Sequence, residues 1–176
     1  MDDHAQQQQA LAEFRKAKDA HFRRDRQSPL TPEQQQAFHG LRYYPFNPDL
    51  HLELSLDRNV PDDIVRLETS TGDAQEYRRA GKVHFNVDTQ PAELTIYRGP
   101  SGDLFLPLRD ATSGNETYGA GRYLEPELVE EGTVRLDFNY LYNPYCAYND
   151  AWSCPLPPRE NWLRVPLHSG EQSFHD

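Results

Sequence analysis

From residue 50 onward, apolar and polar residues alternate along much of the chain, and this period of two indicates β-strands with one solvated face. Residues 50–56 place a leucine at every second position, and residues 83–87 alternate valine, phenylalanine and valine with polar side chains. Short strands separated by turn sequences about every ten residues are typical of an antiparallel sandwich or barrel. Further strands are expected over residues 64–69, 75–79, 82–88, 92–97, 104–108, 121–124, 133–140 and 162–167.

The N-terminal part of the chain has a helical pattern instead. Three large apolar residues share one face of the segment 10–24, which we expect to be a helix, whereas the Gln-rich residues 1–9 are expected to be frayed. A helix docked on a sheet is favoured over a helix on a membrane surface, because the apolar stripe is narrow. Thr31, Pro32 and Gln34 then combine an N-cap, a first-turn proline and a capping box, which predicts a short second helix ending near Gly40.

Together these patterns predict a mainly β fold, a single antiparallel β-sandwich or partly open barrel with one or two N-terminal α-helices. The chain shows no internal repeat and no linker that divides it into two domains. We therefore expect one domain overall, with an N-terminal helix and flexible start over residues 1–27. A β-rich part over 28–170 and a loose tail over 171–176 complete it.

Charge and composition exclude some classes of function. The 176 residues carry a formal net charge of -10, which argues against a nucleic-acid partner because phosphate binding needs clustered positive charge. No apolar run approaches the roughly 18 residues of a membrane span, and the start of the chain has no signal-peptide pattern. We therefore expect a cytoplasmic protein without a membrane partner, and the sequence leaves the oligomeric state open.

The most informative stretch is residues 134–162, where a strand breaks at Asn143 and becomes a long loop dense in Tyr and Asn. Such loops usually have a role beyond connecting two strands. The loop holds Cys146 and Cys154, whose spacing of eight and distance from the scattered His residues predict no metal site. Two buried packing thiols are favoured, and a Cys146–Cys154 disulfide or a catalytic Cys146 thiolate are the alternatives.

Two further segments offer polar side chains. Residues 110–124 form a Gly-rich stretch without a phosphate-binding motif, so a long hairpin loop is the simpler interpretation. In the functional interpretation, Arg122 is an anion anchor beside hydroxyl groups at a pocket mouth. Asp137 and Asn139 share the polar face of the strand before the Tyr/Asn loop. They face water in a sandwich, or point into a polar cavity where Asp137 is a general base.

These segments resemble a known family. The pattern D-x-T-S-G-x-x-T-Y-x-x-G-R-Y-L covers 110–124, L-D-F-N-x-x-Y-N-P-x-C-A-Y-N covers 136–149, and C-P-L-P-P-x-x-N covers 154–161. Together they resemble domain of unknown function 1684, an uncharacterised bacterial and archaeal family, and the motifs at 28–30 and 38–45 fit it too. One departure is Tyr145, where the family pattern has a second proline. The resemblance implies no activity, but it supports one constellation: Arg122, Tyr123, Asp137, Asn139, Tyr142, Asn143, Cys146 and Cys154.

We therefore expect a small polar or anionic molecule to bind in a pocket formed by residues 110–124 and 136–161, without a cofactor. The alternatives are a small hydrolase-like or thiol-dependent enzyme that uses Asp137 or Cys146 in the same pocket, and a purely structural role for both motifs. The predicted ligand-binding residues are Arg122, Tyr123, Asn139, Tyr142, Asn143, Tyr148 and Asn149.

Overall fold

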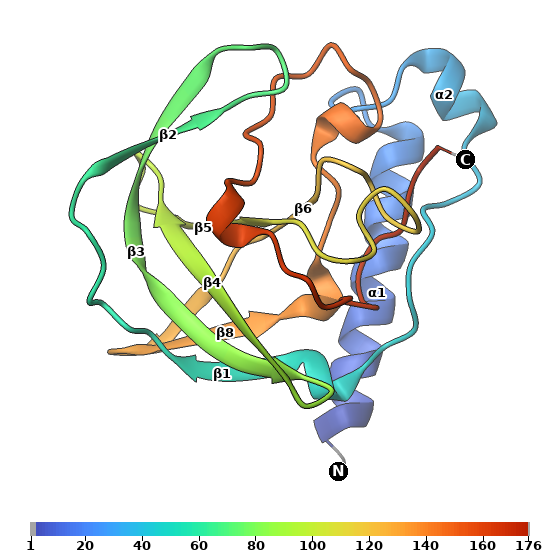
Figure 1. The fold of residues 1–176 in the computed structure, drawn as a ribbon. Helices are drawn as coiled ribbons and strands as arrows, with labels where there is room; N and C mark the ends of the chain where they lie inside the picture. The colour runs from blue at the N-terminus through green and yellow to red at the C-terminus, as the bar shows by residue number, and fades with distance from the viewer. Residues whose placement is uncertain (1–2, 176) are drawn as a thin grey trace.

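The computed structural model describes residues 3–175 and has two antiparallel sheets with helices along one side (Figure 1). The first sheet has the order β1-β8-β7 and the second β2-β3-β4-β5-β6. The strands are β1 (His51–Ser55), β2 (Ile64–Glu68), β3 (Ala74–Val87), β4 (Gln90–Arg98), β5 (Leu104–Leu108), β6 (Arg122–Leu124), β7 (Glu127–Glu130) and β8 (Thr133–Asp137). The predicted mainly β fold is confirmed.

Two α-helices precede the sheets, and four single-turn 3₁₀-helices interrupt the loops of the described chain. The helices are α1 (Asp3–Arg24), α2 (Pro32–Ala37), η1 (Pro48–Leu50), η2 (Phe138–Tyr140), η3 (Tyr145–Ala147) and η4 (Arg159–Asn161). Helix α2 begins as predicted, because the Thr31 hydroxyl accepts from the Gln34 amide while the Gln34 side chain accepts from the Thr31 amide. Helix α1 already begins at Asp3, so the frayed start expected for residues 1–9 is wrong for residues 3–9.

The main core lies between the two sheets. It consists of the side chains that point inward from both sheets. Val83 and Leu94 of the second sheet and Leu136 of the first are among them, and none of the three has exposed surface. Helix α1 buries Leu11 and Phe22, which are each 2% exposed, and Phe22 belongs to a second apolar cluster with Leu30, Phe38 and Tyr148. Phe14 lies on the same helix and is 46% exposed, which leaves its ring free to line a surface hollow.

Several strand boundaries differ from those expected. Residues 75–79 and 82–88 belong to a single strand, β3, whose pairing with β4 shifts between Arg79 and Gly81. Residues 162–167 form no strand, and only an isolated bridge joins Trp162 to Arg109. Strand β7 was not predicted, because its four residues are all exposed and its apolar and polar residues do not alternate.

The C-terminal segment is packed, not loose. Glu171 is 2% exposed, and its backbone amide donates to the carbonyl of Leu141. The backbone amides of Gln172 and Ser173 donate to Arg42 and Glu116. The predicted boundary at residue 170 therefore cuts through a segment that is part of the fold.

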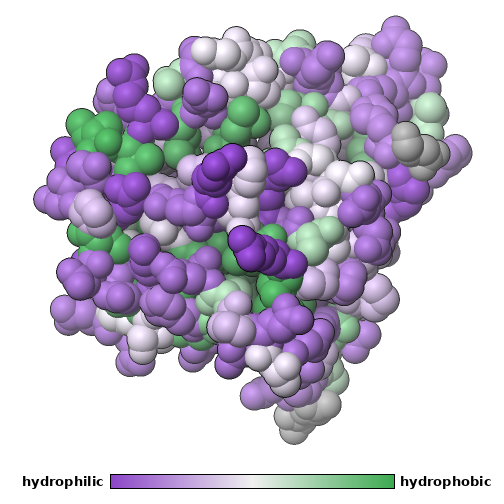
Figure 2. All heavy atoms as spheres, viewed as in Figure 1, coloured by the Kyte–Doolittle hydropathy of each residue, from purple (hydrophilic) through white to green (hydrophobic). Residues whose placement is uncertain are grey.

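The surface is largely polar, as the net charge suggests. On the face shown in Figure 2, hydrophilic residues dominate and hydrophobic residues show between them in separate patches. Within residues 3–175, no helix combines the length and the hydrophobicity that crossing a membrane requires.

Candidate functional site

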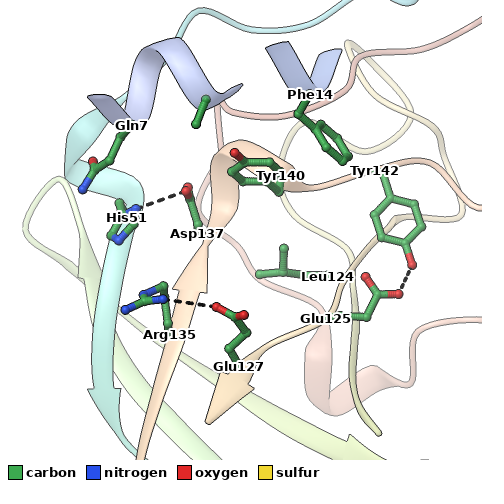
Figure 3. A pocket seen from close by; sticks show the side chains of 11 residues that line it. Gln7, Phe14, His51, Leu124, Glu125, Glu127, Arg135, Asp137, Tyr140 and Tyr142 are labelled. Atoms are coloured by element: carbon green, nitrogen blue, oxygen red, sulfur yellow. Dashed lines mark hydrogen bonds and ion pairs between the residues drawn. The ribbon is translucent and has the colours of Figure 1, made fainter. Parts of the chain in front are cut away.

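A surface hollow of about 590 Å³ lies between helix α1 and the three-stranded sheet (Figure 3). Its volume is within the range of small-molecule sites, about 300–1,000 Å³. Helix α1 supplies Gln7, Ala10 and Phe14 on one side, and β1 and β8 supply side chains opposite. The remaining lining residues are His51, Leu124, Glu125, Glu127, Arg135, Asp137, Tyr140 and Tyr142.

The end of strand β8 positions the aromatic wall. The Asp137 carboxylate accepts a hydrogen bond from the Asn139 backbone amide at 3.0 Å, which turns the chain from a strand into the 3₁₀-helix η2. This turn brings Tyr140 toward helix α1, where its ring meets Phe14 edge-on with centroids 5.0 Å apart. Tyr142 follows two residues later and adds a third ring to the hollow.

An imidazole–carboxylate pair lies on the sheet side of the hollow. His51 and Asp137 are directly opposite each other in the β1–β8 ladder, and His51 Nδ1 lies 3.1 Å from Asp137 Oδ2. The other oxygen of Asp137 accepts from Asn139 Nδ2 at 2.9 Å, and Asn139 exchanges two hydrogen bonds with the Asn47 backbone. When Nδ1 of His51 donates to this carboxylate, Nε2 of the neutral imidazole is left as an acceptor.

The charges around the hollow are mostly negative. Three carboxylates, Glu125, Glu127 and Asp137, line it together with one arginine, Arg135. Arg135 bonds to Glu53 at 3.0 Å and to Glu127 at 3.2 Å, and these hydrogen bonds, that to Glu53 first, raise its pKa. Glu125 accepts from the hydroxyl of Tyr142.

The tyrosine hydroxyls of the hollow stay protonated. Burial raises the pKa of Tyr142, and the charge of Glu125 raises it further. Burial and the charge of Asp137 raise the pKa of Tyr140. Both hydroxyls are therefore neutral at physiological pH, so the tyrosines contribute polar groups without adding to the charge of the hollow.

Two of the predicted site residues, Asp137 and Tyr142, line this hollow, and Asn139 supports it from behind. Of the two predicted pocket segments, 110–124 and 136–161, the first contributes only Leu124 and the second only Asp137, Tyr140 and Tyr142. The rest of the wall comes from helix α1, strand β1 and the residues Glu125, Glu127 and Arg135, and none of these was part of the predicted pocket.

Arg122 lies in the core and not at a pocket mouth. Its side chain has no exposed surface and lies 3.3 Å from Asp110, which is equally buried. Its remaining contacts are the backbone carbonyls of Leu167, Ser169 and Glu171. Burial lowers the pKa of Arg122, and the Asp110 charge opposes that effect. Arg122 thus ties the C-terminal segment to the sheet, and its role as an anion anchor stays a prediction.

The other predicted ligand-binding residues are mostly buried, and they bond to the protein itself. The hydroxyl of Tyr123 donates to the backbone carbonyl of Pro155. The side-chain amide of Asn143 donates to the backbone carbonyl of Gln172. Tyr148 is 1% exposed and donates to Glu171 at 2.7 Å, and burial followed by the charge of Glu171 raises its pKa well above the usual value.

Glu171 and Asn149 complete this set of contacts. Glu171 also receives a hydrogen bond from Lys18 of helix α1. Asn149 is partly exposed, and its side chain accepts from the amide of Ala151 within the same loop.

The two cysteines form a cluster of their own. Both are free thiols, Cys146 is 6% exposed and Cys154 is 7% exposed. They pack with Tyr123, and neither lines the hollow that contains Asp137. Within residues 3–175, no group of three or more His, Cys, Asp or Glu side chains is arranged to hold a metal ion.

The sequence interpretation missed His51, Phe14, Glu125 and Tyr140. His51 looked like the polar face of a strand, and its partner lies 86 residues away in the chain. A weak signal existed for Phe14, because it was one of only three large apolar residues on an otherwise polar helix. No local pattern marked Glu125 as a neighbour of Tyr142.

Comparisons with known proteins identify the family. A family model described as "Protein of unknown function (DUF1684)" matches residues 36–172. The chain belongs to this family. It is also similar to an uncharacterized protein from Haloarcula marismortui, solved in solution by NMR, with 36% sequence identity and a TM-score of 0.73 over 99% of this chain and 98% of that chain. A search of curated proteins found no match.

The matched residues 36–172 include all eight strands but not helix α1. One wall of the hollow, with Gln7 and Phe14, therefore lies outside the region that the family model matches. The Haloarcula protein aligns over nearly the whole chain, so the likeness in fold extends to this helix.

Proposed function

We propose that this protein binds a small organic cation in the hollow between helix α1 and strands β1, β7 and β8. The observation that carries the proposal is the combination of three aromatic rings with three carboxylates against one arginine. Phe14, Tyr140 and Tyr142 provide apolar surface and ring faces that attract a cation. Glu125 offers a carboxylate for an ammonium group.

An anionic ligand is less favourable at this site. Arg135 already bonds to Glu53 and Glu127, so an incoming anion competes with two carboxylates of the protein. Arg122, the anion anchor predicted from the sequence, has its guanidinium occupied by Asp110 and backbone carbonyls. The formal net charge of -10 adds a long-range attraction for cations.

The test compares two cationic probes with an anionic probe of similar shape. We expect 2-phenylethylamine and benzyltrimethylammonium to bind with a Kd of roughly 0.1–1 mM, whereas 3-phenylpropionate does not bind measurably. Isothermal titration calorimetry at low salt measures all three. Tighter binding of the carboxylate, or no binding of either amine, would refute the proposal.

Variants locate the binding site. Phe14→Ala and Glu125→Gln should each weaken amine binding by about tenfold, since each removes a group worth about 1–1.5 kcal/mol to the ligand. Glu76→Gln, an exposed acid on β3, is the matched control and should leave the Kd unchanged. Equal losses for Glu76→Gln and Glu125→Gln would mean that only net charge matters.

A second candidate function is a proton-transfer reaction on the bound molecule. The pair His51–Asp137, held by Asn139, favours it, because the arrangement leaves His51 Nε2 as an acceptor. Cys146 does not line this hollow, so it is not part of this candidate. His51→Gln should abolish turnover of p-nitrophenyl esters with amine-bearing acyl groups while amine binding persists. Unchanged turnover would exclude the His51 role.

We also predict that the protein is located in the cytoplasm, as expected from the sequence. Cell fractionation with an antibody against the chain tests it. Recovery in the membrane or extracellular fraction would contradict it.

A further inference from the structure

The two free cysteines lie together at the surface loop that follows β8. Cys146 is in the 3₁₀-helix η3, and its backbone amide donates to the sulfur of Cys154 at 3.4 Å. The thiols therefore belong to one local arrangement, although eight residues separate them in sequence. Tyr123 of β6 packs against both.

Polar donors converge on the Cys146 sulfur. The hydroxyl of Tyr118 lies 3.5 Å from it, on the chain segment that leads into β6. The Cys154 thiol is the strongest donor to Cys146 and lowers its pKa, with Tyr118 and Ser70 adding to this effect and burial opposing it. Donation to Cys146 raises the pKa of Cys154 in turn. The Tyr118 hydroxyl bonds to the sulfur of Cys146, and this contact favours Cys146 as the attacking thiol of the pair.

The loop that carries the thiols lies at the surface, although both cysteines are buried. Cys146 and Cys154 keep 6% and 7% of their surface exposed, while Tyr145 and Trp152 of the same loop are 39% and 41% exposed. Cys154 is anchored to the turn after β2, where its amide donates to the Ser70 hydroxyl at 3.1 Å. Packing alone does not require two cysteines that share a hydrogen bond, with a tyrosine hydroxyl bonded to one of the sulfurs.

We propose that Cys146 and Cys154 are a redox-active dithiol that hydroperoxides convert into an intramolecular disulfide. The Cys146 thiolate attacks the distal oxygen of the hydroperoxide, the O–O bond breaks, and the alcohol leaves after it takes up one proton. Cys146 is now a sulfenic acid. The Cys154 thiol then attacks the Cys146 sulfur, the S–S bond forms, and the hydroxyl leaves as water with the thiol proton. A dithiol reductant reverses the change.

The neighbouring groups fit these two steps. Tyr118 donates to the Cys146 sulfur, and its own pKa is raised by burial and by the bond to Cys146, so the hydroxyl remains a donor. The charges of Cys146 and Cys154, and after them that of Asp150 in the same loop, also raise the pKa of Tyr118. The new disulfide would close a loop with seven residues between the cysteines, a ring short enough to form within one surface loop.

The first test uses the reduced full-length protein and hydrogen peroxide as the probe. One equivalent of peroxide should lower the intact mass by 2 Da and remove both thiols from alkylation in denaturant, with a Cys146–Cys154 cross-link in the peptide map. The Tm of the oxidised protein should rise by about 5 °C, and dithiothreitol should reverse both changes. Two alkylatable thiols after treatment, a sulfinic acid without a cross-link, or an intermolecular disulfide would each overturn the proposal.

Variants separate the roles of the two thiols. Cys154→Ser should stop at a sulfenic acid that dimedone traps on Cys146, whereas Cys146→Ser should react at least tenfold more slowly than the wild type. Tyr118→Phe should give the same disulfide several-fold more slowly, which a purely structural role of the hydroxyl does not explain. The matched control is Tyr77→Phe on β3, whose hydroxyl donates to Gln75 and not to a cysteine, with a rate equal to that of the wild type. If a cysteine variant fails to fold, the peptide map of the wild type and the rate of Tyr118→Phe still test the proposal. Equal oxidation rates for the two tyrosine variants would count against it.

Discussion

The guanidinium of Arg122 lies 3.3 Å from the carboxylate of Asp110, and neither side chain has any exposed surface. The pair joins the loop after β5 to strand β6. It also reaches the C-terminal segment, because Asp110 accepts from the Leu167 amide and Arg122 donates to the Leu167 carbonyl. A charge pair so fully buried is tolerated only when further hydrogen bonds support both partners. Here the Thr112 hydroxyl and the Leu167 amide donate to Asp110, and Arg122 donates to backbone carbonyls through its two terminal nitrogens.

Arg122→Met should lower the free energy of unfolding by about 3–5 kcal/mol, because it leaves Asp110 buried and unpaired together with the carbonyls that Arg122 serves. Urea denaturation followed by circular dichroism measures the loss. Arg135→Met is the matched control on an exposed ion pair and should cost less than about 1 kcal/mol. Similar losses for the two variants would contradict the structural role assigned to Arg122.

Much of the architecture could be predicted, because alternation within a strand and capping at a helix start are local properties of the sequence. Leu52 and Leu54 lie in the strand β1 that the alternation predicts, and the capping box at Thr31 begins the predicted helix α2. Strand β7 has no such pattern and forms by pairing with β8. The region 162–167 looked like a strand but runs as irregular chain, since its hydrogen bonds go to single partners such as Arg109 and Asp110.

The candidate site was harder to predict, because it depends on register and on long-range neighbours. Asp137 and His51 meet only because β1 and β8 pair with those two residues opposite. An arginine such as Arg122 is a typical anion-binding residue. No pattern in the neighbouring sequence indicates that its guanidinium is already bonded to Asp110 and three backbone carbonyls. The role of Asn161 was equally hard to predict. Its side chain bonds to the backbone of Thr95 and Pro107, which become its neighbours only when the sheet has formed.

The buried tyrosines should make the protein sensitive to alkali. The pKa of Tyr148 is raised well above 10 in the folded state, whereas the unfolded chain releases this proton near pH 10. Between about pH 10 and the raised folded value, the unfolded state therefore binds fewer protons than the folded state, and stability falls as pH rises. The contribution is fully present below pH 10, and at pH 11 the loss is on the order of 1 kcal/mol for this residue.

Denaturation midpoints between pH 8 and 11 measure this slope. Tyr148→Phe should make the decline shallower by about one proton, although the variant starts from a lower stability because Glu171 loses a donor. Tyr145→Phe, at a ring that is 39% exposed, is the control and should keep the wild-type slope. An unchanged slope for Tyr148→Phe would show that this hydroxyl ionises in the folded protein.

Gly119 and Gly121 lie in the turn that leads into β6. Adding a methyl group should destabilise the protein at Gly121 but hardly change its stability at Gly119. Gly121 has a φ of +109°, and a Cβ there would overlap the Leu108 carbonyl and lie 2.9 Å from Cγ of Pro157. Gly119 has no such strain, and a Cβ there meets its nearest atom at 3.7 Å. Gly121→Ala should therefore cost about 2–4 kcal/mol through backbone strain and overpacking, whereas Gly119→Ala should stay within about 0.5 kcal/mol of the wild type. Thermal and urea unfolding measure both. A loss below about 1 kcal/mol for Gly121→Ala would mean that the turn relaxes away from Leu108, and the Arg122 contacts that follow the turn would then have to shift with it.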